Sequence, residues 1–351
     1  MLDAFLGEIL ARGYRTVVFR PAPTLASRAA PHGIRMGAAL FNPTDARSIR
    51  VARRELDLYT MAAFFRLLRP TRETFDFSLA DPTLATTGPS SVVRGHNLIW
   101  CDQLPGWLEE GDFDAADLES ILVEHVRTVV GRFRATFPGR VIAWDVVNEP
   151  FSYRGDDCPW NRIGLERGGD VLDYVRIALR TARTADPDAK LFLNDFFIEG
   201  LGEKSDEMLA LVEQLQSEGV PIDGVGMQAH FRAGPGDLFR EVPPRDEIVQ
   251  NMDRFAALGI ETQITEADVA IRDADLSDVT LDEQAQAYRT LIGACLRAQA
   301  CTAFVTWGVG DPGSWIPETF PGWGAPLLFD DDYAPKPAYF AVMDELAAVA
   351  P

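Results

Sequence analysis

Short apolar segments alternate with longer amphipathic segments from about residue 90 onward, which is the pattern of strands and helices in a parallel sheet. The apolar segments are rich in Val, Ile, Leu and Phe, as expected for strands that are covered on both faces. We predict strands after this point over residues 92–100, 141–147, 190–196, 224–228, 262–265 and 302–307. Two earlier strands are predicted over residues 35–40 and 57–63.

Apolar residues recur at helical spacing between these strands, as Leu118, Leu122 and Val126 do within residues 117–137. Further helices fit residues 171–184, 206–217, 245–258 and 282–297. Eight strands with helices between them predict a (β/α)8 TIM barrel. We expect a single domain over residues 1–351, with residues 1–33 as a lead-in helix or loop packed on the barrel. An open doubly wound sheet also fits the alternation, but no GxGxxG motif follows the first strand.

The charge balance narrows the class of partner. The chain carries 33 Lys and Arg residues against 53 Asp and Glu residues, for a net charge of −20. Such a field repels the phosphates of nucleic acids and anionic membrane surfaces, so we expect neither as a partner and favour a neutral or cationic ligand. No apolar stretch is long enough to span a bilayer. We expect a monomer.

The N-terminal residues do not read as a signal peptide, because Asp3, Glu8 and Arg12 interrupt their apolar run. The compartment therefore stays open between a secreted form whose leader was removed and the cytoplasm. The chain has four cysteines without the paired CxxC spacing of a zinc site, and no cluster of His and Asp at the strand ends suggests another metal. We expect no metal and no cofactor, and four buried thiols are the simplest interpretation.

Two carboxylates follow predicted strands at the end where parallel barrels carry their catalytic groups. Glu149 comes after the strand at 141–147, and Glu266 comes directly after the strand at 262–265. The fourth and seventh strands lie across the barrel mouth from each other, so both side chains can converge on one substrate. Hydrolysis of a glycosidic bond needs a proton donor and an anion that stabilises the oxocarbenium-like transition state. The alternative is that both are buried ion-pair partners.

Other candidate residues at or near strand ends are histidines, amides and tryptophans, namely His96, Asn148, Gln228, His230, Trp307 and Trp315. Sugar rings stack on indole faces, which buries apolar area without using polar groups. The alternative for each histidine is a core imidazole whose hydrogen bonds are satisfied, and the alternative for each tryptophan is a core side chain.

Seven segments together resemble glycoside hydrolase family 10, the endo-β-1,4-xylanases. They occur in the family's order over about residues 90–345 and read RGHNLIWCDQLPGWL, WDVVNEP, PDAKLFLNDF, VPIDGVGMQAH, ITEADV, TWGVGDPGSW and PLLFDDDYAPKPAY. The resemblance implies an oligo- or polysaccharide substrate such as β-1,4-xylan or a related β-glycoside, cleaved by double displacement. It implies Glu149 as the general acid/base and Glu266 as the nucleophile. Retention of configuration predicts carboxyl groups ~5–5.5 Å apart.

The resemblance also implies roles for the surrounding residues. Asn148 is expected to hydrogen-bond the sugar 2-hydroxyl, and His230 is expected to keep Glu266 ionised and oriented. His96 and Gln228 are expected to line the same subsite, and Trp307 and Trp315 to form its walls. Many members of the family carry a disulfide at the positions of Cys295 and Cys301. A bridge between Cys101 and Cys158 across the rim of the active face is left open.

The second predicted strand departs from the family pattern of Glu-Asn followed by Met-Lys-Trp. Those positions hold Thr60, Met61, Ala63, Phe64 and Phe65. Because a lysine donor has become a phenylalanine, we expect altered recognition of the glycone, the sugar upstream of the cleaved bond. Either xylan is a weak substrate, or Phe64 and Phe65 form an apolar wall for a substituted sugar, a glucosyl unit or a glycoside with an apolar aglycone. The alternative function is a carbohydrate-binding pseudoenzyme with the same barrel.

Overall fold

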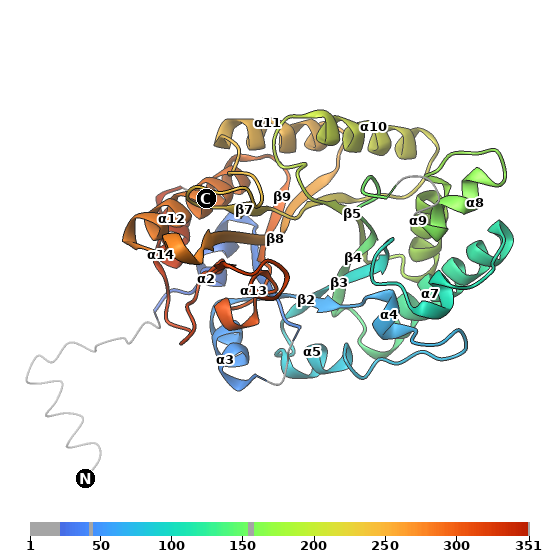
Figure 1. Cartoon of the computed structure of the whole chain (residues 1–351), viewed down its shortest axis with the longest axis horizontal. Helices are drawn as coiled ribbons and strands as arrows, with labels where there is room; N and C mark the ends of the chain where they lie inside the picture. The colour runs from blue at the N-terminus through green and yellow to red at the C-terminus, as the bar shows by residue number, and fades with distance from the viewer. Residues whose placement is uncertain (1–21, 42–44, 154–157, 350–351) are drawn as a thin grey trace, which may run out of the picture.

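The computed structural model describes residues 22–41, 45–153 and 158–349. Its centre is a closed barrel of parallel strands, drawn in Figure 1 with the helices around it. The barrel strands are β1 (Arg35–Ala39), β2 (Leu58–Ala62), β3 (Val92–Ile99), β4 (Val141–Asn148), β5 (Lys190–Asp195), β6 (Gly224–Met227), β8 (Glu261–Arg272) and β9 (Cys301–Thr306). Each pairs with the next in this order, and β9 returns to pair with β1. The predicted (β/α)8 TIM barrel is confirmed.

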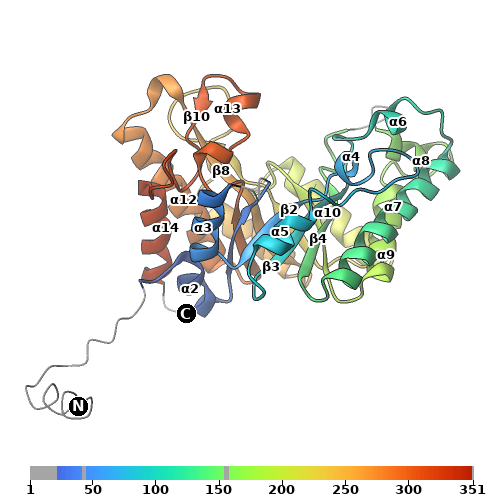
Figure 2. The ribbon, with the colours of Figure 1, turned by 90° about the horizontal axis from the view of Figure 1, so that it is seen from below.

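Helices cover the outside of the barrel and short ones occupy its loops. The long helices are α3 (Ala46–Glu55), α7 (Ala115–Thr136), α9 (Asp173–Ala185), α10 (Glu203–Ser217), α11 (Arg245–Ala256), α12 (Asp278–Arg297) and α14 (Pro337–Ala348). The short ones are α2 (Leu25–Ala29), η1 (Ala30–His32), α4 (Phe65–Leu68), α5 (Asp81–Thr86), α6 (Gly106–Glu109), η3 (Pro159–Asn161), α8 (Arg162–Leu165), η4 (Asp273–Asp275), η5 (Asp311–Gly313) and α13 (Ile316–Thr319). Figure 2 shows α4, α6 and α13 along the upper side of the molecule and α2 on its lower side, so the loops after β2, β3 and β9 lie on the same face of the barrel.

The helix predicted over residues 282–297 begins four residues earlier, at Asp278. Ser277 caps it, because its hydroxyl accepts from the backbone N–H of Thr280 while the Thr280 hydroxyl accepts from the backbone N–H of Ser277. This reciprocal pair satisfies donors that have no partner inside the helix. The Ser277–Thr280 pair was a sequence signal for the helix start that the apolar periodicity alone did not show.

The seventh barrel strand is much longer than the predicted 262–265, because β8 continues to Arg272. Two short strands outside the barrel, β7 (His230–Arg232) and β10 (Trp323–Gly324), pair with this extension. The register places His230 opposite Asp268. The extension therefore brings a second acidic residue beside a histidine at the barrel mouth.

The start of the described chain packs beside α3 and α14. The backbone N–H of Leu25 donates to Glu55 at 3.1 Å, and His32 Nε2 lies 3.1 Å from the carbonyl oxygen of Leu346. The lead-in predicted over residues 1–33 lies in part outside the described residues. None of the helices in the described part of the chain combines the length and apolar character needed to cross a membrane.

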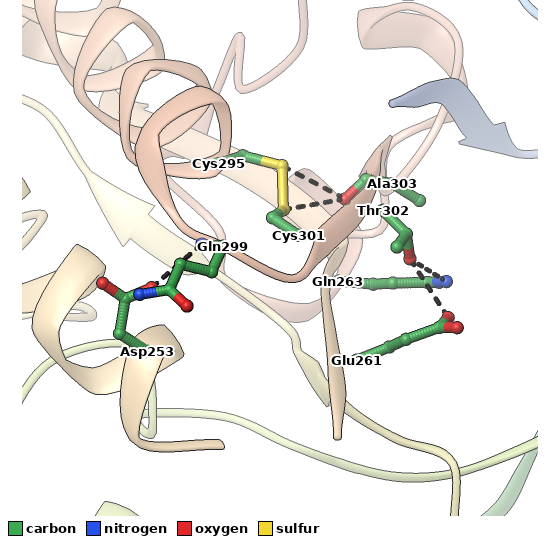
Figure 3. The surroundings of a disulfide bond; sticks show 8 residues. All are labelled: Asp253, Glu261, Gln263, Cys295, Gln299, Cys301, Thr302 and Ala303. Atoms are coloured by element: carbon green, nitrogen blue, oxygen red, sulfur yellow. Dashed lines mark hydrogen bonds between the residues drawn. A yellow bond between two sulfur atoms is a disulfide. The ribbon is translucent and has the colours of Figure 1, made fainter. Parts of the chain in front are cut away.

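All four cysteines form disulfides, so the interpretation of four buried thiols is wrong. Cys295 near the end of α12 is joined to Cys301 at the start of β9, as Figure 3 shows. Cys101 is joined to Cys158, 57 residues further along the chain. The first bridge lies where β9 enters the barrel, and the second lies in the loops that follow β3 and β4.

Candidate active site

Glu149 directly follows β4 and has a φ of 53°, in the left-handed region that favours glycine. A residue with a side chain pays ~1–2 kcal/mol for this conformation. The backbone N–H of Glu149 donates to the carbonyl oxygen of Asn194 on β5 at 2.8 Å, which fixes the turn out of the strand. Strained residues of this kind cluster at functional sites.

Three amide side chains connect Glu149 to Glu266. Gln228 Nε2 donates to Glu149 Oε1 at 3.0 Å and lies 3.3 Å from Asn148 Oδ1. Asn194 Nδ2 donates to the same Asn148 oxygen at 2.8 Å and to Glu266 Oε1 at 2.6 Å. Side chains from β4, β5, the end of β6 and β8 are thus joined in one network, and the two carboxylates belong to one site.

Glu266 also faces an imidazole held by another acid. His230 Nε2 lies 3.3 Å from Glu266 Oε2, and His230 Nδ1 lies 2.9 Å from Asp268 Oδ1. The indole N–H of Trp315 donates to the other Asp268 oxygen at 2.8 Å. Burial alone would lower the pKa of His230, but the charges and hydrogen bonds of Asp268 and Glu266 raise it to about 10. At neutral pH a cationic ring therefore faces Glu266 Oε2 across 3.3 Å.

His96 occupies the other side of Glu266. Its Nδ1 lies 2.9 Å from Asp145 Oδ2 and 3.6 Å from Glu266 Oε1. Burial opposes protonation, but Glu266 and Asp145 together raise the pKa of His96. The same Asp145 carboxylate accepts from the fully buried guanidinium of Arg94, whose Nε lies 2.9 Å away. Arg94 Nη1 donates to Gln263 at 2.6 Å. This buried charge network supports the Glu266 side of the site from inside the barrel.

Glu149 lies in a contrasting environment. Burial raises its pKa, and the nearby charge of Glu266 raises it further. Hydrogen bonds from Gln228 and from the indole N–H of Trp100, which lies 3.2 Å from Glu149 Oε2, lower the pKa of Glu149. A carboxyl whose pKa is raised by burial, beside one that faces a cation, is the arrangement that separates an acid from a nucleophile.

An arc of aromatic rings lines the side of the mouth formed by β9, β1, β2 and β3. The Phe41 ring centroid lies 4.9 Å from Trp307 and 6.2 Å from Phe64, and Phe64 lies 5.5 Å from His96 and 6.2 Å from Trp100. Phe41 is 39% exposed. Sequence reasoning did not select Phe41, although a large apolar residue just after a predicted strand was the available signal.

The other residues of the altered second strand do not reach this arc. Met61 is fully buried in the main hydrophobic core, and Thr60 is fully buried with no hydrogen-bond partner for its hydroxyl. Phe65 is also buried and stacks on His125 with ring centroids 3.7 Å apart. Of the two rings offered as an apolar wall, Phe65 packs in the interior and only Phe64 reaches the arc. Thr60 and Met61, at the altered positions of the second strand, also lie in the interior.

A cavity of about 540 Å³ opens on the opposite side of the site, beside β5 and β7. Its lining includes Phe151, two residues after Glu149, with Phe197, Lys204 and Arg240. The Lys204 ammonium donates to Asp195 Oδ1 at 2.6 Å, and Asp195 follows Asn194 at the end of β5. Phe151 places this cavity beside the start of the loop that follows Glu149.

Sequence reasoning also missed Asn194 and Asp268. Asn194 lies near the end of a predicted apolar strand, where the rule that selected Glu149 would have found it. Asp268 is two residues after Glu266, and residues two apart in a strand share a face. This second signal depended on the strand continuing beyond residue 265.

A parallel β/α barrel with paired carboxylates in contrasting environments at the C-terminal ends of its strands is typical of a glycoside hydrolase. The model of glycosyl hydrolase family 10 matches residues 24–345, and the chain belongs to this family. The family cleaves with retention through double displacement, and the chain is a retaining glycoside hydrolase of the endo-1,4-β-xylanase type.

Named relatives and solved structures agree with this placement. The chain is 40% identical to an endo-1,4-beta-xylanase of Agaricus bisporus over 277 residues, 78% of each chain. It is 36% identical to endo-1,4-beta-xylanase B of Thermotoga neapolitana over 334 residues, 92% of this chain and 91% of the relative. Xylanase 10B from Thermotoga petrophila RKU-1, solved with xylobiose, superposes with a TM-score of 0.83 at 32% identity and covers 94% of this chain and 98% of its own.

Proposed function

We propose that Glu149 is the general acid/base and Glu266 the nucleophile in the hydrolysis of a β-1,4-xylan-like substrate. The observation that carries this assignment is the contrast in charge around the two carboxyls: burial favours the protonated form of Glu149, whereas Glu266 faces the protonated His230. Two carboxyls with opposed surroundings perform the two roles that glycosidic cleavage requires.

In the first step, Glu266 attacks the anomeric carbon while the glycosidic C–O bond breaks and Glu149 gives its proton to the leaving oxygen. In the second step, Glu149, now ionised, takes a proton from water, and the water oxygen displaces Glu266 from the anomeric carbon. Asn148 is connected to both carboxyls, since its Nδ2 donates to Glu149 Oε1 at 3.2 Å and its Oδ1 accepts from Asn194, which also donates to Glu266. It is the residue proposed to bind the sugar 2-hydroxyl.

The aglycone is assigned to the cavity lined by Phe151, Lys204 and Arg240, on the Glu149 side. The glycone is then assigned to the arc of rings formed by Phe41, Phe64 and Trp307. A sugar hydroxyl that leaves water and meets a phenyl ring loses its hydrogen bond, at ~1–3 kcal/mol for each group. We therefore propose that the glycone is recognised mainly by apolar contact and that unsubstituted xylosyl units bind weakly on this side.

Replacing Phe64 with lysine is expected to raise kcat/KM for aryl β-xylobiosides about tenfold, because one donor to a sugar hydroxyl contributes ~1.4 kcal/mol. The matched control is Phe64→Leu, which removes the ring without adding a donor and is expected to give no increase. Initial rates would be compared at equal concentrations of folded enzyme. A Phe64→Lys variant no better than Phe64→Leu would overturn the proposal for the glycone side.

The carbohydrate-binding pseudoenzyme remains the alternative, and its motivation is the phenylalanine at position 64. Binding alone does not require a carboxyl pair in contrasting surroundings, so the environments of Glu149 and Glu266 favour turnover. Release of shorter sugars from xylo-oligosaccharides during a calorimetric titration distinguishes the two functions. Heat of binding with no product after prolonged incubation would support the alternative.

A further inference from the structure

The disulfide between Cys101 and Cys158 joins two loops at the mouth of the barrel. Cys101 is the second residue after β3, and Cys158 immediately precedes η3 in the loop after β4. The bridge is nearly inaccessible, since Cys101 is 9% exposed and Cys158 is fully buried. Glu149 lies at the start of the loop that carries Cys158. The cross-link therefore ties the neighbourhood of the acid/base candidate to the end of β3.

A hydrogen bond next to the disulfide holds the same two loops together. The indole N–H of Trp160, in η3, donates to the carbonyl oxygen of Trp100 at 3.0 Å. Trp160 is fully buried, and its ring lies 5.6 Å from that of Phe65. The adjacent residues Trp100 and Cys101 are thus held from one segment by a hydrogen bond and by a covalent bond.

Trp100 connects the anchored loop to Glu149. It lies just beyond the end of β3, so the barrel strand does not include it. Its side chain is only partly buried, and its indole N–H donates to Glu149 Oε2 at 3.2 Å. The position of this donor therefore depends on the contacts that fix the loop after β3.

We propose that the Cys101–Cys158 disulfide is a positioning element that keeps the Trp100 indole on Glu149. The inference rests on the proposed role of Glu149 as general acid/base. With the bridge open, the Trp100 loop samples positions in which the N–H no longer reaches Glu149 Oε2. Proton delivery to the leaving oxygen then slows, because a displacement of about 1 Å in an active site can cost up to ~10²-fold in rate.

The chain supplies its own matched control, the Cys295–Cys301 disulfide. It links α12 to the first residue of β9, at the opposite end of the strand from Trp307. Figure 3 shows its surroundings, and the sulfur contacts given there are to the carbonyl oxygen of Ala303. Both bridges constrain the unfolded chain, so loss of either lowers stability. Only the first is expected to change proton transfer.

The test compares Cys101→Ala/Cys158→Ala with Cys295→Ala/Cys301→Ala. For the first variant we expect kcat/KM on a xylo-oligosaccharide to fall about tenfold, and kcat/KM on an aryl glycoside with a highly acidic leaving phenol to change less than about twofold. Loss of the Trp100 donor raises the pKa of Glu149, so the alkaline limb of the kcat/KM profile moves to higher pH. Trp100→Phe is expected to reproduce both effects, whereas the Cys295→Ala/Cys301→Ala variant is expected to show neither.

The proposal is overturned if Cys101→Ala/Cys158→Ala and Cys295→Ala/Cys301→Ala have the same leaving-group dependence and the same pH profile. Should the first variant fail to fold, Cys101→Val/Cys158→Ala, which refills part of the buried volume of the bridge, gives the same comparison, and an unchanged profile there also overturns the proposal. Failure of the proposed role of Glu149 looks different, because Glu149→Ala itself would then lack any dependence on the leaving group.

Discussion

Replacing Glu266 with glutamine is expected to lower kcat on xylo-oligosaccharides by about 10⁴-fold or more, the loss typical of removing a nucleophile. The amide has nearly the same shape as the carboxyl and can still meet Asn194 and His230, but it cannot form the glycosyl ester on which double displacement depends. The measurement is release of reducing sugar under saturating substrate, with folding checked by thermal melting.

The matched control for Glu266→Gln is Glu55→Gln. Glu55 is as buried as Glu266, at 3% exposure for each residue, but it bonds the backbone of Leu25 and the hydroxyl of Tyr339 on the outside of the barrel. Glu55→Gln is expected to lose stability while its folded fraction keeps wild-type kcat. Equal rates for wild type and Glu266→Gln would exclude Glu266 as the nucleophile.

Replacing Glu149 with alanine is expected to lower kcat/KM on xylo-oligosaccharides by about 10²–10⁴-fold, the range for a general acid. The loss depends on the substrate, because the phenolate of an aryl glycoside with an acidic phenol departs without receiving a proton. With such a substrate the first step continues, while the second step slows for lack of a base. Rapid mixing is therefore expected to show a burst of one equivalent of phenol followed by a slow steady rate.

The pH dependence gives a second readout of Glu149 in the wild type. Because burial raises its pKa, the protonated acid persists to higher pH than it would for an exposed glutamate, and the alkaline limb of kcat/KM is displaced upward accordingly. In Glu149→Ala that limb is expected to disappear for the activated aryl glycoside. A loss of equal size for all leaving groups, with the alkaline limb retained, would contradict the acid/base assignment.

The barrel and its two central carboxylates could be predicted from sequence because both follow a simple rule. Strands covered on both faces form continuous apolar runs, and a polar residue that ends such a run faces the mouth of a parallel barrel. Glu149 meets this rule directly. Glu266 does so only approximately, because β8 continues beyond it to Arg272 through pairing with β7 and β10. That pairing is a tertiary contact, and local periodicity does not contain it.

The aromatic arc and the disulfides show why other details could not be predicted. Phe64 and Phe65 are adjacent at the start of α4, yet one faces the site and the other packs on His125, because neighbouring residues of a helix point in different directions. Residue type alone does not distinguish Phe64 from Phe65, so the sequence suggested that both rings line the site. The connectivity of cysteines is likewise not fixed by their spacing, and the bridge from Cys101 to Cys158 depends on two loops that meet only in the folded barrel.

The most direct test of the central claim is covalent labelling with an aryl 2-deoxy-2-fluoro-β-xylobioside that carries an acidic leaving phenol. Fluorine destabilises the oxocarbenium-like transition states and so slows both steps. The good leaving group keeps the first step faster than the second, so the glycosyl-enzyme accumulates. We expect intact mass to rise by one fluoroxylobiosyl group, the label to map to Glu266 after proteolysis, and the Glu266→Gln variant to take up none. A label on Glu149 or elsewhere, or hydrolysis with no covalent species, would contradict the account.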